Sequence, residues 1–154
     1  MNKFTRRSAL VAATLALATG TLPALAHDDA TMKLLKSANG GQLRMTGIYH
    51  FELVVDKNSK EPKDNPVLVY VTDHAGTKIP TAGATGSVTL LGGKLKSTAT
   101  LQPDGDNRLK GTAKYASTPD LKAVVSITLA NKAPEQARFT PMVAADNSAS
   151  EHKH

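Results

Sequence analysis

The sequence predicts an all-β protein, an immunoglobulin-like antiparallel β-sandwich of about seven strands. Three observations carry this prediction. Short stretches alternate between apolar and polar residues with a period of two, glycine, proline and aspartate separate these stretches at regular spacing, and no long stretch has a helical period. Antiparallel sandwiches combine short strands with frequent turns in this way. The 154 residues are enough for one domain with a two-sheet core.

The first predicted strand covers 49–55, where apolar residues at odd positions alternate with His50, Glu52 and Val54. Residues 56–66 are charged and contain two prolines, so we expect a loop that stays outside the sheet. The next strand, 67–72, is apolar on both faces, which favours a central position. It is followed by a segment of turn composition.

Five further strands are separated by strong turn signals. Gly92 and Gly93 join two of them as a hairpin, and the segment 102–107 forms the next turn. These strands are 87–91, 95–101, 109–115, 123–129 and 136–140. The predicted core contains Tyr49, Phe51, Leu53, Val69, Val71, Val125, Ile127 and Phe139.

Residues 1–26 are expected to be a signal peptide. A cationic start is followed by the apolar stretch 9–18, and Ala24-Leu25-Ala26 is a small-x-small cleavage pattern. The apolar stretch is about half of the ~20 residues that span a bilayer, so we expect no membrane insertion after processing. The predicted organisation is a signal peptide 1–26, an N-terminal arm 27–41, a β-sandwich domain 42–141 and a disordered tail 142–154. The protein is expected in the periplasm, by the secretory or the twin-arginine route.

Composition and motifs exclude several classes of function. The chain has Cys 0, which rules out disulfide scaffolds, iron–sulfur sites and thiol catalysis. Part of the formal charge of +6 lies in the signal peptide, and the remaining cations are too dispersed for a nucleic-acid interface. Nucleophile elbows, Walker A loops, dinucleotide-binding glycines and zinc-protease motifs are missing from the sequence. We therefore expect neither an enzyme nor a nucleic-acid partner.

Histidine is the residue type in this sequence that indicates a specific chemistry, namely metal binding. His27 would begin the processed chain, where its α-amine and its ring Nδ1 can chelate one Cu(II) ion, and Asp28 could add an axial oxygen. His50 or His74 would supply the further nitrogen. This arrangement is similar in position to the copper site of CopC-type copper-resistance proteins. The alternatives are that His50 is an ordinary surface residue and that His74 caps a turn.

Two other residue types offer weaker metal ligands. His152 and His154 in the tail can bind Ni(II), Cu(II) or Zn(II) weakly, or are incidental residues of a solvated tail. Met32 and Met45 could serve Cu(I), the alternative being that they fill the core. The cofactor that we expect is therefore Cu(II), with other divalent heavy metals as alternatives.

The chain also resembles a family of small exported bacterial proteins, over about Gly40 to Pro141. The stretches that carry the resemblance are 40–42, 47–54, 70–76, 83–86, 91–94, 106–111 and 137–141. Similar stretches occur ahead of, or are encoded beside, the CzcB-like periplasmic adaptor subunits of heavy-metal efflux pumps. The resemblance implies a metal-stress context. This chain differs from the related sequences at Asn39, where they often carry histidine. A metal site that used that histidine would be weaker here.

Two functions follow as predictions. The first is a periplasmic metal-binding protein in metal resistance or homeostasis. The alternative is a non-catalytic interaction module that docks on a heavy-metal efflux adaptor. Such a module could use the loop in which lysines alternate with acidic residues between Asp56 and Asp64, which is otherwise a solvated, charge-balanced loop.

Overall fold

The computed structural model describes residues 37–143, which form eight antiparallel strands in one sheet with the order β1-β2-β3-β6-β5-β4-β7-β8. The predicted all-β antiparallel fold is confirmed. The strands are β1 (Gln42–Thr46), β2 (Tyr49–Val55), β3 (Lys63–Asp73), β4 (Thr85–Gly92), β5 (Leu95–Pro103), β6 (Arg108–Tyr115), β7 (Lys122–Thr128) and β8 (Pro134–Phe139).

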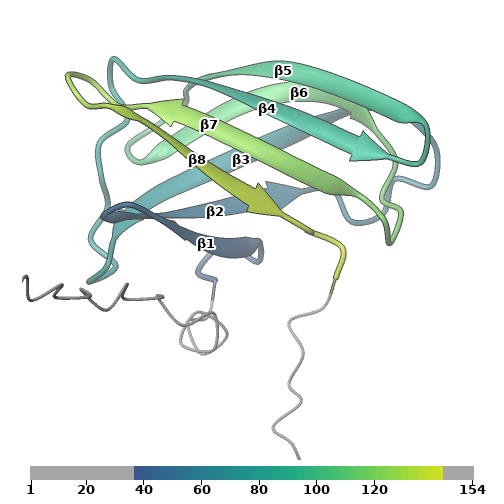
Figure 1. Cartoon of the computed structure of the whole chain (residues 1–154), viewed down its shortest axis with the longest axis horizontal. Helices are drawn as coiled ribbons and strands as arrows, with labels where there is room; N and C mark the ends of the chain where they lie inside the picture. Colours follow the sequence, from purple (N-terminus) through teal and green to yellow (C-terminus); the bar gives the residue numbers. More distant parts are fainter. Residues whose placement is uncertain (1–36, 144–154) are drawn as a thin grey trace, which may run out of the picture.

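The sheet folds back on itself, so that two layers face each other across the core (Figure 1). One layer contains β1, β2, β3 and β6, and the other contains β5, β4, β7 and β8. The end of β5 joins them, because Gln102 and Pro103 pair with Lys110 and Leu109 of β6. The sandwich is therefore continuous along this side.

Side chains close the opposite side, where β1 meets β8. The side chain of Gln42 accepts a hydrogen bond from the Thr140 amide at 2.7 Å and donates one to the Thr140 carbonyl at 3.1 Å. Thr46 Oγ1 donates to the Glu135 carboxylate at 2.9 Å. These contacts make the sheet nearly closed.

All eight of the predicted core residues are buried, each with at most 7% of its surface exposed. In β3, the buried residues Val67, Val69 and Val71 alternate with half-buried ones, and the strand lies between β2 and β6. The central position of this strand is thus confirmed, although only one of its faces is fully buried.

Strand β1 was not predicted as a separate element. Gly47 and Ile48 connect it to β2 as a two-residue hairpin, with Gly47 at a φ of 53° in the first central position. The pattern of β1 is inverted, since Gln42 and Thr46 point toward the seam with β8 while apolar Leu43 and Met45 lie on the outer face. Because the inner-facing residues of β1 are polar, its sequence lacks the apolar inner face from which the other strands were predicted.

The expected loop 56–66 is wrong at its end, because β3 already begins at Lys63. The register of β2 with β3 ends at the pair Val55 and Val67, so the first residues of β3 extend past β2 and pair with β6 alone. Pro66 lies in this extension. An edge position needs no backbone N–H on its open side, which is why a proline is tolerated there.

Candidate metal-binding site

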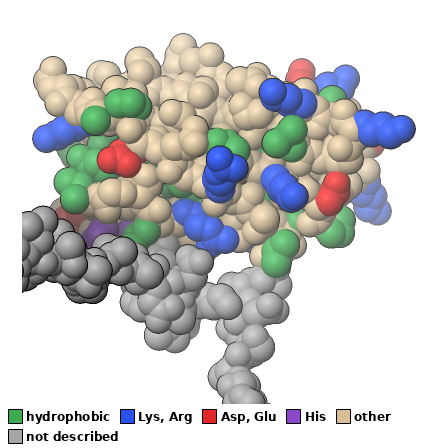
Figure 2. Space-filling model, viewed as in Figure 1, with side chains coloured by type: hydrophobic (Ala, Val, Ile, Leu, Met, Phe, Trp, Pro, Cys, Tyr) green, Lys and Arg blue, Asp and Glu red, His purple; other side chains and the backbone are tan. Residues whose placement is uncertain are grey.

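The structure brings together two of the histidines that the sequence singled out. His50 lies on the outer face of β2, since its neighbours Tyr49 and Phe51 are core residues, and it pairs with Thr72 of β3. His74 lies in the turn that follows β3. The two imidazole rings are stacked, with centroids 4.8 Å apart and 14° between their planes. Figure 2 shows histidine surface at the lower left edge of the molecule.

The imidazole of His50 is almost completely buried, with 4% of the residue exposed, so it is not an ordinary surface residue. Its Nε2 has no hydrogen-bond partner within residues 37–143. Burial lowers the pKa of His50, and repulsion from His74 lowers it further, while Asp73 acts in the opposite direction. A neutral imidazole has the lone pair that a metal ion requires, so these surroundings favour the ligand form of His50.

The turn that carries His74 is held by Asp73. The Oδ1 atom of Asp73 accepts the backbone N–H groups of Ala75 at 2.9 Å and Thr77 at 2.8 Å. The hydrogen bond from Thr77 is the largest cause that lowers the pKa of Asp73. The carboxylate is therefore ionised and engaged with its own turn, whereas the His74 side chain is exposed and can change its ring orientation.

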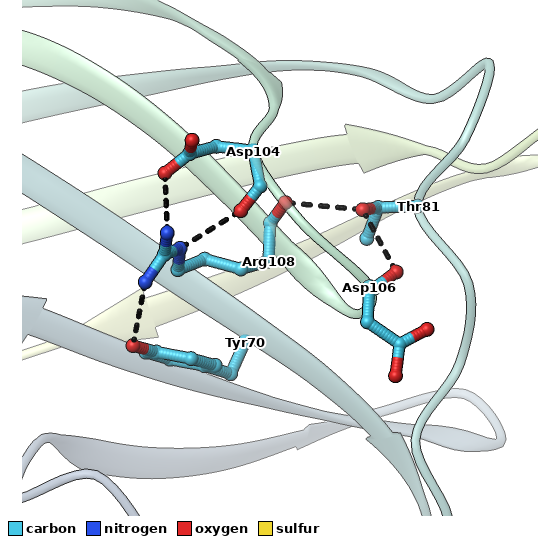
Figure 3. A network of polar contacts seen from close by, with 5 residues as sticks. All are labelled: Tyr70, Thr81, Asp104, Asp106 and Arg108. Carbon is cyan, nitrogen blue, oxygen red and sulfur yellow. Dashed lines mark hydrogen bonds and ion pairs between the residues drawn. The ribbon is translucent and has the colours of Figure 1, made fainter.

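A polar network fixes the end of β3 that leads into this turn. Asn107 forms two hydrogen bonds with the backbone of Val71. Its backbone carbonyl accepts the Val71 amide at 2.9 Å, and its side-chain amide donates to the Val71 carbonyl at 3.0 Å. Arg108 forms an ion pair with Asp104 at 2.8 Å and reaches the Tyr70 hydroxyl at 3.5 Å (Figure 3). The backbone beneath the imidazole pair is thus set by contacts with the start of β6.

Glu52, two residues along β2 from His50 and on the same face, has its carboxylate engaged. Its Oε1 accepts the amides of Asn39 at 2.8 Å and Gly41 at 2.9 Å, and its Oε2 accepts the Asn39 side-chain amide at 2.9 Å. The segment leading into β1 is thereby held against β2. Asn39, where the resemblance implied histidine, is here a partner of Glu52.

Met45, which the sequence offered as a possible Cu(I) ligand, faces His50 across the β1–β2 hairpin, a position that sequence reasoning did not predict. Met45 is the direct partner of His50 in the register, so both side chains lie on the outer face. Met45 is half-buried and is not a member of the hydrophobic core cluster, whereas Met142 packs against that cluster. The two-residue hairpin at Gly47 and Ile48 is the sequence signal that would have fixed this register.

The other predicted ligands, His27, Asp28, His152 and His154, lie outside the residues that the structure describes. The N-terminal chelate and the weak tail site therefore stay predictions. Among residues 37–143, no group of three or more histidine, cysteine, aspartate or glutamate side chains is arranged to hold a metal ion. The imidazole pair needs a further donor from elsewhere.

A cavity lies at the far end of β3, where Lys63 pairs with Tyr115. Its volume of about 220 Å³ is below the ~300–1,000 Å³ of usual ligand pockets. Lys60, Lys114 and Asp120 border it, and the Asp120 carboxylate accepts the Gly93 amide at 2.6 Å. The cavity offers fewer chemical possibilities than the imidazole pair.

The face formed by β4, β7 and β8 presents separate lysine and arginine side chains and a few acidic ones among uncharged ones (Figure 2). Hydroxyl side chains contact one another across strands on this layer, as in the 3.1 Å hydrogen bond between Thr89 and Thr98. This face offers hydrogen bonding rather than concentrated charge.

Fold and site together define an all-β antiparallel protein with a stacked imidazole pair on the outer face of one layer. Comparisons with protein-family models, with curated proteins and with solved structures give no match. In the part of the chain that the structure describes, no helix has the length and apolar character needed to cross a membrane.

Proposed function

We propose that this chain is a periplasmic metal-binding protein that serves metal resistance or homeostasis by holding copper or another heavy-metal ion. The observation that carries the proposal is the pair of imidazoles of His50 and His74, with ring centroids 4.8 Å apart. Imidazole nitrogen suits copper, zinc and nickel, and Cu(II) heads the affinity order among divalent ions for such donors.

The processed N-terminus supplies the remaining donors in this proposal. The α-amine and imidazole of His27 belong to one residue, so a single ordering event brings two nitrogens to the ion. His50 or His74 then contributes the next nitrogen, and Asp28 an axial oxygen. Because the ligands must be deprotonated, Cu(II) affinity falls as the pH drops through the histidine range near ~6.5.

Copper titration of matched variants tests this proposal. All proteins carry His152→Gln and His154→Gln, which remove the tail ligands. The processed form that begins at His27 should bind one Cu(II) with a dissociation constant below ~1 μM, about −8 kcal/mol. The double variant His50→Gln, His74→Gln should weaken binding at least tenfold, and so should one extra alanine before His27.

Lys114→Gln, an exposed change at the far end of β6, should leave copper affinity unchanged. Equal binding with and without the extra alanine would exclude the terminal chelate. Binding that survives the loss of both His50 and His74 would exclude the imidazole pair.

One observation favours the alternative function, an interaction module that docks on a heavy-metal efflux adaptor. Val54 and Leu68 pair across β2 and β3 on the outer face and are only half-buried, which leaves apolar surface for a partner. Such a module should keep its adaptor binding after both histidines are replaced, whereas Leu68→Lys should weaken it.

A further inference from the structure

A row of side chains crosses β1, β2 and β3 on the outer face of the first layer. Met45 is paired with His50, and His50 is paired with Thr72, so the three residues lie side by side in register. Directly opposed residues in antiparallel strands have Cβ atoms about 5 Å apart, within reach of a thioether and an imidazole. His74, stacked on His50, adds a second imidazole to the same place.

The unpartnered nitrogen of His50 marks this row as a ligand site. Nε2 of His50 is buried and makes no hydrogen bond to any of the described residues, although the great majority of buried polar atoms in proteins are paired. A residue that is 96% buried does not leave a nitrogen unpaired at no cost, and a bound ion would satisfy it. The thioether sulfur of Met45 is only a weak hydrogen-bond acceptor, so it offers this nitrogen at most a weak hydrogen bond, whereas both groups can bind one metal ion.

The nearest carboxylates are engaged elsewhere, so hard donors are scarce at this point. Both oxygens of Glu52 accept hydrogen bonds from Asn39 and Gly41. Oδ1 of Asp73 accepts two amides of its own turn. Apart from the Thr72 hydroxyl and the second Asp73 oxygen, the donors here are one soft thioether and two imidazoles, and thioether sulfur selects soft ions such as Cu(I) over hard ones.

We propose that Met45 Sδ and the imidazoles of His50 and His74 form a three-coordinate site for a soft monovalent ion, Cu(I) or Ag(I). This inference rests on the proposed metal-binding function and names the charge and class of its ion. Near-parallel rings do not direct two nitrogens at one point, so binding requires a ring to turn. His74 is exposed in its turn and its ring torsion is broad, so the turning residue is His74.

Silver is the probe, because Ag(I) shares the ligand preferences of Cu(I) and is not oxidised in air. The full processed chain, with His152→Gln and His154→Gln, is titrated with Ag(I) in competition with a chelator of known affinity, and separately with Cu(II). Met45→Leu should weaken Ag(I) binding at least tenfold and change Cu(II) binding by less than threefold. Met142→Leu removes a thioether that packs on the core and should change neither affinity.

Methionine methyl resonances give a readout that does not depend on variants. In protein labelled with [methyl-¹³C]methionine, Ag(I) should shift the Met45 methyl signal and leave the Met142 signal in place. An unmoved Met45 signal, or Ag(I) affinity unchanged by Met45→Leu, overturns the thioether site. If the double variant His50→Gln, His74→Gln still weakens Cu(II) binding at least tenfold in that case, the proposed function stands without this inference. If that double variant binds Cu(II) and Ag(I) as tightly as the parent protein, the proposed function and this inference are both refuted.

Discussion

Removing the hydroxyl group of Tyr115 tests how the segment between β2 and β3 is fastened to the sheet. Tyr115 ends β6 and is 2% exposed. Its hydroxyl donates to the Pro66 carbonyl at 2.8 Å and accepts the Asp56 amide at 2.9 Å. Burial raises the pKa of Tyr115, which keeps the hydroxyl a donor at neutral pH. Phenylalanine fills the same space, so Tyr115→Phe deletes these two hydrogen bonds and little else.

The size of the effect follows from the groups that lose a partner. Each buried backbone group left without a hydrogen bond costs about 1–3 kcal/mol. Asp56 is half-buried and Pro66 is exposed, so water reaches both and each cost lies near the lower end of that range. With two groups near the lower end of the range, we expect the free energy of unfolding to fall by about 2 kcal/mol in total. For a domain of this size the Tm then falls by roughly 10 °C.

Urea denaturation followed by circular dichroism measures this loss, and an unchanged m value shows that the same surface unfolds. Tyr70→Phe is the matched control, because the Tyr70 hydroxyl has only a 3.5 Å contact with Arg108 on a half-exposed side chain. We expect this control to cost less than ~0.5 kcal/mol. Equal losses for the two variants would refute the fastening role of Tyr115.

Two further predictions concern pH and backbone packing. The folded pKa of His50 lies below the unfolded value of ~6.5, so the unfolded chain binds more protons as the pH falls. The contribution of His50 to stability is complete above pH ~6.5 and is lost as the pH falls toward the folded pKa. His50→Gln should therefore flatten the stability curve of the metal-free protein in acid, and an unchanged slope would contradict this cause. Gly111→Ala would place a Cβ 2.5 Å from a backbone oxygen of β5 and should cost about 1–3 kcal/mol. Gly92→Ala, with its nearest atoms at 3.4 Å, should cost far less in the same denaturation experiment.

Local sequence patterns were sufficient to predict most of the strands and the residues of the core. The alternation over 49–55 shows which residues of β2 point inward, and Gly92-Gly93 marks the hairpin between β4 and β5, although Gly92 still pairs with Leu95 and the turn itself is Gly93-Lys94. Both signals depend on residues that are close in sequence, so no long-range information is needed to interpret them. The start of β3 was mispredicted because the tolerance of Pro66 depends on a neighbouring strand that ends early.

The sequence by itself determined the all-β class, the inward-facing residues and the short set of histidines worth testing. Only the tertiary structure determines which of these histidines lie close together. His50 and His74 come together because β2 and β3 pair in one register, and Met45 joins them because a hairpin of two residues sets the register of β1. Register is a relation between strands. A shift of one residue would turn every side chain of a strand to its other face, so no property of a single strand can specify such a site.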